Sequence, residues 1–269
     1  MCGDSANHEQ IEKLMDGKKA SMVFTDPPYN VNYGATMKDK LRHKVSSENA
    51  GRKILNDHFE TKQEFYQFLY NSISGIRPFV IGDLYICMSS SELDTLQRAF
   101  RDCGGHFSTF IIWVKNSFTI GRSNYQRQYE PILYGWFDKS SHFWSGIRNL
   151  SDVIRSDDYK IDEEGVVWLK AEGIPTDIWD VPRPVKSKDH PTMKPIKLCS
   201  RGIVNSSKRD DIVLDIFGGS GSTLIACEQT KRICYMSELD PKYVDVIRRR
   251  YWKFVTESEE GWENGTPKI

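Results

Sequence analysis

The chain has 269 residues, of which 39% are hydrophobic and 28% are charged, and its formal net charge is zero. This composition is typical of a globular protein, and no apolar run reaches the roughly 20 residues that a membrane-spanning helix needs. A net charge of zero gives no overall attraction to nucleic acid, so any basic surface must be local.

The N-terminus and the cysteines indicate the compartment, and the histidines bear on metal binding. The opening residues MCGDSANHEQ lack the basic and apolar regions of a secretory signal, which predicts a cytoplasmic protein. The six cysteines contain no CxxC pair, as expected of free thiols in a reducing compartment. The six histidines lack metal-ligand spacing, so we expect no bound metal.

Strand-like and helix-like segments alternate along most of the chain. Short apolar runs predict strands at 22–26, 84–89, 110–115, 131–137, 212–217 and 232–239. Apolar residues at helical spacing predict helices at 61–76, 91–105, 195–207, 222–231 and 241–255. The helix at 91–105 is expected to begin with a serine cap and to end on glycines. The alternation predicts an α/β fold with a mostly parallel, doubly wound sheet covered on both faces.

Residues 138–189 interrupt this alternation, because they are polar and rich in turn residues. We interpret them as an insertion or recognition segment. They separate a first part of the domain, 1–137, from a second part, 190–255, and residues 256–269 form a tail.

The first predicted strand ends on Asp26, and Pro27, Pro28 and Tyr29 follow at once. Two prolines fix the local φ and cannot donate to a ladder, so the backbone after Asp26 is rigid and extended. Taken alone, this pattern also fits a turn that ends a strand.

A locally basic segment follows this turn. Residues 38–53 contain two acidic residues and six basic ones, namely Lys38, Lys40, Arg42, Lys44, Arg52 and Lys53. The segment is either a solvated polar loop or a flexible loop that binds phosphate. Its position directly after the turn at 26–29 favours the phosphate-binding loop.

The second motif, DIFGGSGST at 215–223, follows a buried strand and opens a helix. Glycines let the backbone approach a ligand, and the helix N-terminus offers unpaired N–H groups. Leu224 stands where a dinucleotide fingerprint has its third glycine, which disfavours a pyrophosphate site. Asp215 suits a sulfonium or ammonium group, and Glu238 at the end of the next strand suits a ribose. The motif therefore predicts an S-adenosylmethionine site, with a ligand-free turn as the alternative.

Together, DPPY and DIFGGSGST resemble the DNA amino-methyltransferases, in the beta class that carries DPPY first. Other segments similar to the family are CGDS (2–5), ILND (54–57), YEPILYG (129–135), FDKSSHFW (137–144), TDIWDVP (176–182) and HPTMKP (190–195). The resemblance covers nearly the whole chain. It implies a Rossmann-like, seven-stranded S-adenosylmethionine-dependent methyltransferase sheet with permuted motif order, and a target-recognition insertion at 138–189.

The resemblance also implies roles for individual residues. The Asp26 carboxylate and the Pro27 carbonyl would accept the two hydrogens of an exocyclic amine, and Pro28 would keep this cup rigid. Tyr29 would stack on a base that has left the duplex. The expected cofactor contacts are Asp4, Thr192, Lys194, Asp215, Phe217, Gly218, Gly219, Gly221, Thr223 and Glu238. Lys194 is the candidate for the cofactor carboxylate, and Asp4 is the candidate for its adenine amine unless it caps a helix.

Several alternatives for the reaction stay open. Aspartate in the first position of the motif favours N6-adenine over N4-cytosine. A C5-cytosine mechanism needs a cysteine nucleophile, typically after proline, and the sequence has no Pro-Cys pair. RNA or a protein amide is a further possible substrate, and an inactive nucleoside-binding subunit is a possible non-enzyme.

The resemblance also bears on partners. It implies a double-stranded DNA substrate and often a homodimer. Because the chain begins almost on CGDS, we expect an excised catalytic domain of a longer protein with a further N-terminal domain.

Overall fold

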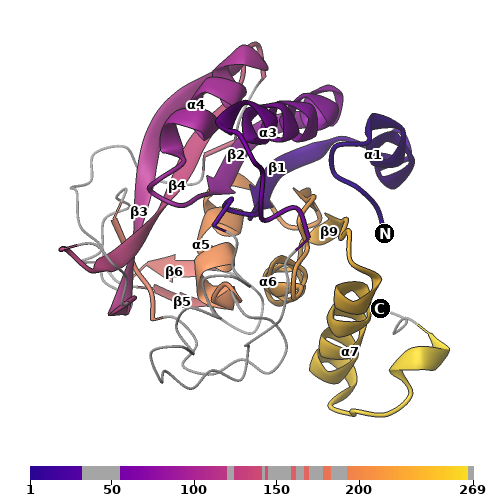
Figure 1. Ribbon diagram of the computed structural model, residues 1–269. Coiled ribbons are helices and arrows are strands. Elements are labelled where there is room, and N and C mark those ends of the chain that lie inside the picture. The colour runs from indigo at the N-terminus through magenta and orange to yellow at the C-terminus, as the bar shows by residue number, and fades with distance from the viewer. Residues whose placement is uncertain are drawn as a thin grey trace, which may run out of the picture.

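The computed structural model describes residues 1–31, 55–119, 124–140, 143–144, 159–161, 167–169, 178–182 and 193–265 (Figure 1). The helices are α1 (His8–Met15), α3 (Lys62–Ile76), α4 (Leu93–Asp102), α5 (Ile196–Ser206), α6 (Ser222–Thr230) and α7 (Pro241–Thr256). The strands are β1 (Ala20–Thr25), β2 (Val80–Cys87), β3 (Gly105–Thr119), β4 (Arg127–Phe137), β5 (Tyr159–Ile161), β6 (Val167–Leu169), β7 (Ile178–Asp180), β8 (Ile212–Asp215) and β9 (Ile233–Met236).

Seven of these strands form one mixed sheet in the order β7-β3-β4-β2-β1-β8-β9. Strand β1 pairs in parallel with β2 and β8, and β8 pairs in parallel with β9. Strand β4 is antiparallel to both β2 and β3, while β7 is parallel to β3. The predicted α/β fold and its seven-stranded sheet are therefore confirmed.

The centre of the sheet is a topological switch point. The chain passes from β1 to β2 on one side, and from β8 to β9 on the other. Connections that diverge from two adjacent parallel strands leave a crevice beyond the carboxyl ends of those strands, where ligands bind. The two motifs follow β1 and β8, so the fold brings them to the same crevice although they are far apart in the sequence.

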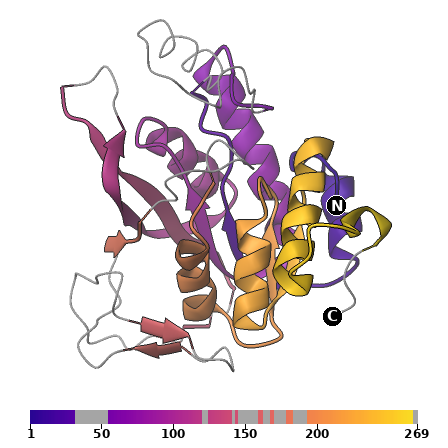
Figure 2. The same cartoon turned by 90° about the horizontal axis from the view of Figure 1, so that it is seen from below.

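Two helical layers cover the sheet. Helices α1, α3 and α4 pack on one face, where Val23 of β1 joins their apolar side chains. Helices α5 and α6 pack on the other face, against Met22 and Phe24. Val23 faces one helical layer, and its neighbours Met22 and Phe24 face the other, because successive side chains of a strand point to opposite faces of the sheet. In Figure 2, α5, α6 and α7 lie in front of the sheet.

The helices begin where their sequences offer side-chain caps. The side chains of Asn7, Thr61 and Asp240 accept hydrogen bonds from backbone amides in the first turns of α1, α3 and α7. Such caps satisfy amides that the helix itself leaves unpaired. Pro241 occupies the first position of α7, where its missing N–H costs nothing.

Helix α4 differs from its prediction at one end. It begins at Leu93, and its N-terminal cap is Glu92, whose side chain makes no capping bond. The predicted serine cap is wrong, because the Ser91 hydroxyl bonds instead with the hydroxyl of Ser89, at 2.9 Å. The predicted glycine end is confirmed, since Gly104 has a φ of 77°.

Helix α1 and the short strands β5, β6 and β7 were not predicted. Helix α1 has only eight residues, and only Ile11 and Met15 of it are buried, which is too short a pattern to recognise. Strand β7 has three residues and lies within the segment 138–189, yet it joins the main sheet beside β3. The Trp113 indole donates to the Val181 carbonyl at 2.7 Å, which fixes the end of this segment against β3.

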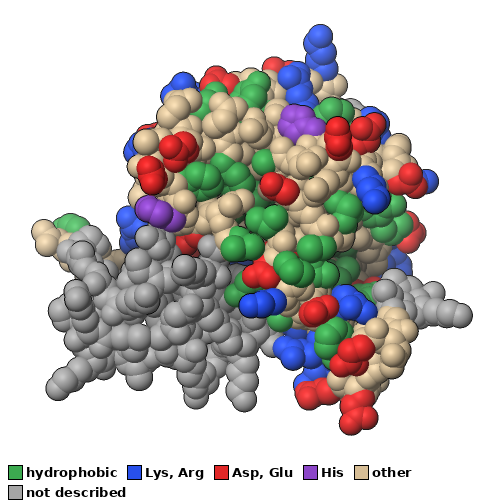
Figure 3. All heavy atoms as spheres, turned by 45° about the vertical axis from the view of Figure 1, so that its right-hand side comes forward, with side chains coloured by type: hydrophobic (Ala, Val, Ile, Leu, Met, Phe, Trp, Pro, Cys, Tyr) green, Lys and Arg blue, Asp and Glu red, His purple; other side chains and the backbone are tan. Residues whose placement is uncertain are grey.

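The described surface has mixed charge. Figure 3 shows basic and acidic side chains interspersed over the coloured part of the face that it presents. Among the described residues, no helix has both the length and the apolar character that crossing a membrane requires.

Two isoleucines of β2 provide a matched test of the core. Ile86 is 2% exposed and Ile81 is 46% exposed. Truncation of a buried isoleucine removes apolar contacts and leaves a cavity, so Ile86→Ala should lower the free energy of unfolding by about 2–5 kcal/mol. Ile81→Ala should change it by less than about 1 kcal/mol. Urea denaturation followed by circular dichroism measures both, and equal losses would contradict the assigned burial.

Candidate active site

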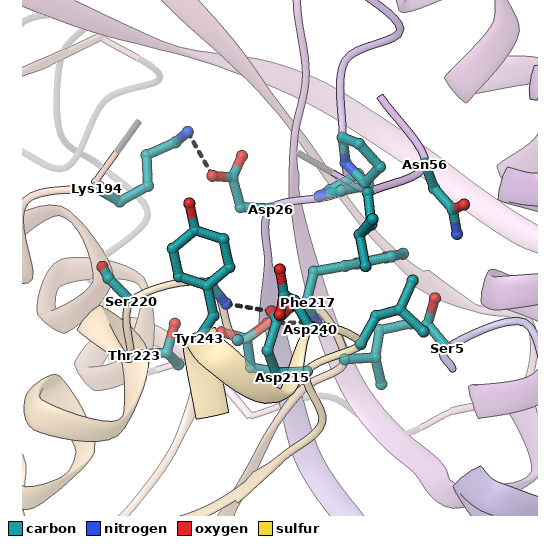
Figure 4. A pocket seen from close by; sticks show the side chains of 18 of the residues that line it. Ser5, Asp26, Asn56, Lys194, Asp215, Phe217, Ser220, Thr223, Asp240 and Tyr243 are labelled. Carbon is teal, nitrogen blue, oxygen red and sulfur yellow. Dashed lines mark hydrogen bonds and ion pairs between the residues drawn. The ribbon is translucent and has the colours of Figure 1, made fainter. Parts of the chain in front are cut away.

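A cavity lies at the carboxyl ends of β1 and β8 (Figure 4). It is lined by both motifs, by residues 55–57, and by residues from the N-terminus and from α7. Its polar and aromatic lining includes Ser5, Asp26, Tyr29, Asn56, Asp57, Lys194, Asp215, Phe217, Ser220, Ser222, Thr223, Glu238, Asp240 and Tyr243. In Figure 4, Lys194 and Asp26 point toward one another, while Asp215 and Phe217 occupy another part of the wall.

The DPPY segment is fixed by side chains on both sides of the turn. The Tyr29 hydroxyl lies 2.7 Å from Oδ1 of Asp26. The Tyr29 amide donates to the buried Asp57 carboxylate at 3.2 Å. Pro27 and Pro28 line the cavity between them. Asp26 is thus held at the end of β1 with its carboxylate on the cavity wall.

Lys194 connects this segment to the cofactor motif. Its Nζ donates to Oδ2 of Asp26 at 2.7 Å and to the Tyr29 hydroxyl at 2.9 Å. Its backbone carbonyl accepts a hydrogen bond from the Ser222 hydroxyl, at 2.8 Å, at the start of α6. The ammonium group therefore lies beside the DPPY segment of the cavity, and binding of a cofactor carboxylate by Lys194 stays a prediction.

Two further charged residues complete this cluster. Oε2 of Glu130 lies 3.1 Å from the Tyr29 hydroxyl and 3.3 Å from Nζ of Lys194. Lys115 donates to Oε1 of Glu130. Two carboxylates and two ammonium groups then balance one another around a neutral phenol. We name Asp26, Tyr29, Lys115, Glu130 and Lys194 the catalytic cluster.

The charges in the catalytic cluster shift one another's pKa values. Burial raises the pKa of Asp26, although Lys194 opposes this rise. Burial also acts to raise the pKa of Glu130, but Lys194 and Lys115 outweigh it and hold the pKa at about 2. For Lys194, burial lowers the pKa, and the carboxylates of Asp26 and Glu130 more than compensate, so its pKa is raised. Lys194 and Glu130 are therefore both charged at neutral pH.

The glycine-rich loop after β8 depends on its glycines. Gly219 and Gly221 have φ values of 53° and 80°, in the left-handed region that favours glycine. A Cβ atom on Gly218 would lie 2.9 Å from the side chain of Met236. The Gly221 amide donates to the Gly218 carbonyl at 2.8 Å, and α6 begins at the next residue. The loop therefore folds back tightly and leads directly into the N-terminus of α6.

Asp215 is the last residue of β8 and is 3% exposed. Its Oδ1 accepts hydrogen bonds from the Thr25 hydroxyl at 2.8 Å and from the Phe217 amide at 3.1 Å. Burial raises its pKa to about 6, while hydrogen bonds from Thr223 and Thr25 oppose the rise. A cationic ligand beside this carboxylate would favour its ionised form.

Glu238 follows β9 and closes the far side of the loop. Its two carboxylate oxygens accept the amides of Gly219 at 2.7 Å and of Asp240 at 2.9 Å. Burial raises its pKa. Each carboxylate oxygen has a second lone pair, so Glu238 still has acceptor capacity for hydroxyl groups. The Gly3 amide donates to the Glu238 carbonyl at 2.9 Å, which brings the N-terminal residues to the cavity.

Most predicted site residues line this one cavity, and two do not. Asp4 accepts the Ala6 amide at 2.9 Å and is not part of the lining. The alternative that Asp4 caps a helix is wrong, because Asn7 caps α1. Gly221 also lies outside the lining; a Cβ atom on it would lie 3.1 Å from Ile247 of α7.

Other predicted contacts fall outside the described residues. They are Thr192 and the six basic residues Lys38, Lys40, Arg42, Lys44, Arg52 and Lys53. Their roles stay predictions. Within the described ranges, no group of three or more His, Cys, Asp or Glu side chains is placed to hold a metal ion.

The sequence reasoning missed Asp57, Glu130 and Lys115 as site residues. A weak signal existed for two of them. Glu130 directly precedes the apolar run PILYGWF, and Lys115 ends the run FIIWVK. A charge at the end of a buried strand calls for a partner, but only the β3–β4 register, which pairs Trp113 with Glu130, shows that these two charges meet.

Comparison with known sequences gives the family. The profile of a family described as DNA methylase, which covers N6 and N4 amino-methyltransferases, matches residues 20–249. A type II methyltransferase of Moraxella bovis, M2.MboI, is 27% identical over 93% of this chain and 85% of its own length. M.HpaI of Haemophilus parainfluenzae is 26% identical over 88% of this chain and 70% of its own. The DNA adenine methyltransferase YhdJ of Escherichia coli is 25% identical over 88% of this chain and 78% of its own.

Comparison with solved structures supports the fold. M1.HpyAVI in complex with SAM superposes with a TM-score of 0.60 and 22% identity, covering 93% of this chain and 98% of that one. The cytosine-N4-specific PvuII DNA methyltransferase superposes with a TM-score of 0.62 and 16% identity, covering 98% and 88%. The family profile spans most of the sheet and both motifs. The chain therefore belongs to the DNA methylase family, the amino-methyltransferases that act on DNA.

Proposed function

We propose that the protein is a site-specific DNA methyltransferase that transfers a methyl group from S-adenosylmethionine to N6 of adenine. One observation carries this proposal: Asp26 and Tyr29 share a single cavity with Asp215, Gly219 and Glu238. An amine-binding cup and a nucleoside-binding loop in one cavity suit a transfer between the two ligands.

The cofactor part of the cavity fits S-adenosylmethionine. Asp215 offers a buried carboxylate to a cationic amino-acid end, and Glu238 offers free acceptor positions to ribose hydroxyls. The tight glycine-rich loop lets backbone approach the ligand. S-adenosylmethionine, when bound, supplies a methyl group made electrophilic by its sulfonium. The solved M1.HpyAVI complex, of the same fold, contains this cofactor.

The catalytic part of the cavity fits a planar amine. The lone pair of an exocyclic amine is delocalised into the ring, so the amine is a poor nucleophile. Asp26 accepts one amine hydrogen and the Pro27 carbonyl accepts the other, which localises the lone pair on nitrogen. The Asp26 oxygens each keep a lone pair beyond the bonds from Tyr29 and Lys194. A base can reach this position only outside the duplex, with Tyr29 stacking on it.

Adenine is favoured over cytosine, and nucleic acid over peptide. Asp26 in the first position of the motif favours adenine, and YhdJ is named a DNA adenine methyltransferase. The fold itself does not distinguish the bases, because the PvuII enzyme with the same fold is cytosine-N4-specific. We further propose that the basic residues of 38–53 contact the DNA backbone and that 138–189 recognises the target sequence.

Methyl transfer tests the proposal directly. Labelled S-adenosylmethionine is incubated with unmethylated genomic DNA, and the product nucleosides are identified by mass spectrometry. We expect N6-methyladenine. N4-methylcytosine would keep the mechanism and overturn the choice of base, while methyl groups found only on RNA or protein would overturn DNA as substrate.

Replacement of the catalytic carboxylate tests the cup. Asp26→Ala should reduce transfer by roughly 100-fold or more, because one acceptor of the activated amine is lost. Cofactor affinity, measured by calorimetry, should change by less than about threefold, since Asp26 lies on the base side. Asp94→Ala, in an exposed residue of α4, is the matched control with unchanged transfer. Undiminished transfer by Asp26→Ala would contradict the assigned cup.

The raised pKa of Asp215 predicts a pH dependence of cofactor binding. Only the ionised carboxylate attracts a cation, and with a pKa of about 6 it becomes protonated as the pH falls below that value. Affinity for S-adenosylmethionine should therefore be about tenfold weaker at pH 5 than at pH 7.5. Asp215→Asn should bind weakly at both pH values with much less difference between them. Calorimetric titrations of both proteins measure this, and an equal pH dependence in the two would contradict the role of Asp215.

A further inference from the structure

Glu130 lies in β4, outside both motifs, and is not part of the cavity lining. Its carboxylate lies behind Tyr29 and Lys194, which do line the cavity. Glu130 thus touches neither the base position nor the cofactor position. Any influence that it has on the reaction must pass through these two neighbours.

A single oxygen of Glu130 holds both groups that orient Asp26. Oε2 lies 3.1 Å from the Tyr29 hydroxyl and 3.3 Å from Nζ of Lys194. The Tyr29 hydroxyl lies 2.7 Å from Oδ1 of Asp26, and Nζ of Lys194 lies 2.7 Å from Oδ2. The Tyr29 hydroxyl has one hydrogen to share between Asp26 and Glu130, whereas Lys194 has three, enough for both carboxylates and the Tyr29 oxygen. Glu130 therefore acts on Asp26 mainly through Lys194, which also contacts Tyr29.

Charge balance explains why a glutamate suits this position. Side chains of Lys194 and Lys115 are 8% and 9% exposed, and those of Glu130 and Asp26 are 19% and 24% exposed. Two ammonium groups at this depth need two carboxylates, because a partly buried charge without a partner is costly. Lys115 occupies the other oxygen of Glu130, so Oε2 stays directed at Tyr29 and Lys194.

We propose that Glu130 is a positioning residue for methyl transfer: it holds Tyr29 and Lys194 in the places from which they orient the Asp26 carboxylate toward the target amine. This inference rests on the proposed function. A rotated Asp26 carboxylate would still bind Lys194, but its remaining lone pair would no longer point at the amine. Misplacement of a reacting group by about 1 Å can cost 100-fold in rate.

The first variant is Glu130→Gln, which keeps the length of the side chain and removes its charge. A glutamine keeps one neutral acceptor oxygen and presents NH₂ to the remaining donors, so in either orientation of the amide it holds the Lys194 ammonium more weakly than the carboxylate does. We expect kcat for methyl transfer to fall by roughly 10- to 100-fold. The KM for S-adenosylmethionine should stay within about twofold, because Glu130 does not touch the cofactor position.

A matched control comes from Glu228→Gln. Glu228 of α6 accepts the Tyr251 hydroxyl at 2.9 Å, outside the cavity lining. The two variants remove the same kind of tyrosine–carboxylate bond. Glu228→Gln should therefore alter thermal stability while leaving kcat within about twofold of the wild type.

A double variant separates positioning from charge balance. Glu130→Gln alone leaves one extra positive charge in the catalytic cluster and can destabilise the fold. Glu130→Gln combined with Lys115→Met restores neutrality, so the melting temperature should recover toward the wild-type value. Under the positioning role, kcat stays low in the double variant because a neutral amide still stands in place of the carboxylate that attracts Lys194.

The measured kcat values decide whether Glu130 acts by positioning Tyr29 and Lys194 or only by balancing charge. Wild-type kcat in Glu130→Gln, or recovery of kcat in the neutral double variant, would overturn the positioning role and leave the proposed function intact. Failure of the wild-type protein to methylate DNA, RNA or protein would overturn the proposed function and this role together. A loss of kcat in both variants with unchanged KM for the cofactor supports the inference.

Discussion

The partly buried ion pair between Asp26 and Lys194 joins segments 168 residues apart, at a distance of 2.7 Å. It is the point where the two halves of the site meet. Asp26 directly follows β1 and opens the DPPY motif, and the Lys194 carbonyl accepts a hydrogen bond from Ser222 at the start of α6, which follows the glycine-rich motif. Displacement of either segment would break a charged contact in a poorly solvated place, so the two motifs hold a fixed relative position.

The fold brings the two motifs to the same end of the sheet. Strands β1 and β8 are adjacent and parallel at the switch point of the sheet, so their carboxyl ends open into one crevice. The apolar sides of the helices pack on both faces of the sheet and keep the strands in place, while the polar residues of the cavity lie at the strand ends. Under the proposed function, base chemistry and cofactor binding depend on neighbouring strands, and the order in which the chain visits these strands does not alter the geometry.

Local patterns predicted much of this structure and little of the catalytic cluster. Strands β1, β2, β3, β4, β8 and β9 and most helices follow from apolar runs and periodicity. The motifs mark the strand ends at which Asp26, Tyr29, Asp215 and Glu238 stand. Glu130 could not be predicted, because its role depends on the antiparallel register of β3 and β4. The pairing of Lys194 with Asp26 was missed because it joins segments 168 residues apart, and Lys194 was assigned to the cofactor from its motif alone.

A crystal structure of the protein with S-adenosylmethionine tests the central claim most directly, that one cavity holds both the amine cup and the cofactor. We expect the ribose hydroxyls on Glu238 and the methyl carbon within roughly 6 Å of the Asp26 carboxylate, close enough for an amine nitrogen to lie between them. Cofactor bound outside this cavity, or a methyl group directed away from Asp26, would contradict the account.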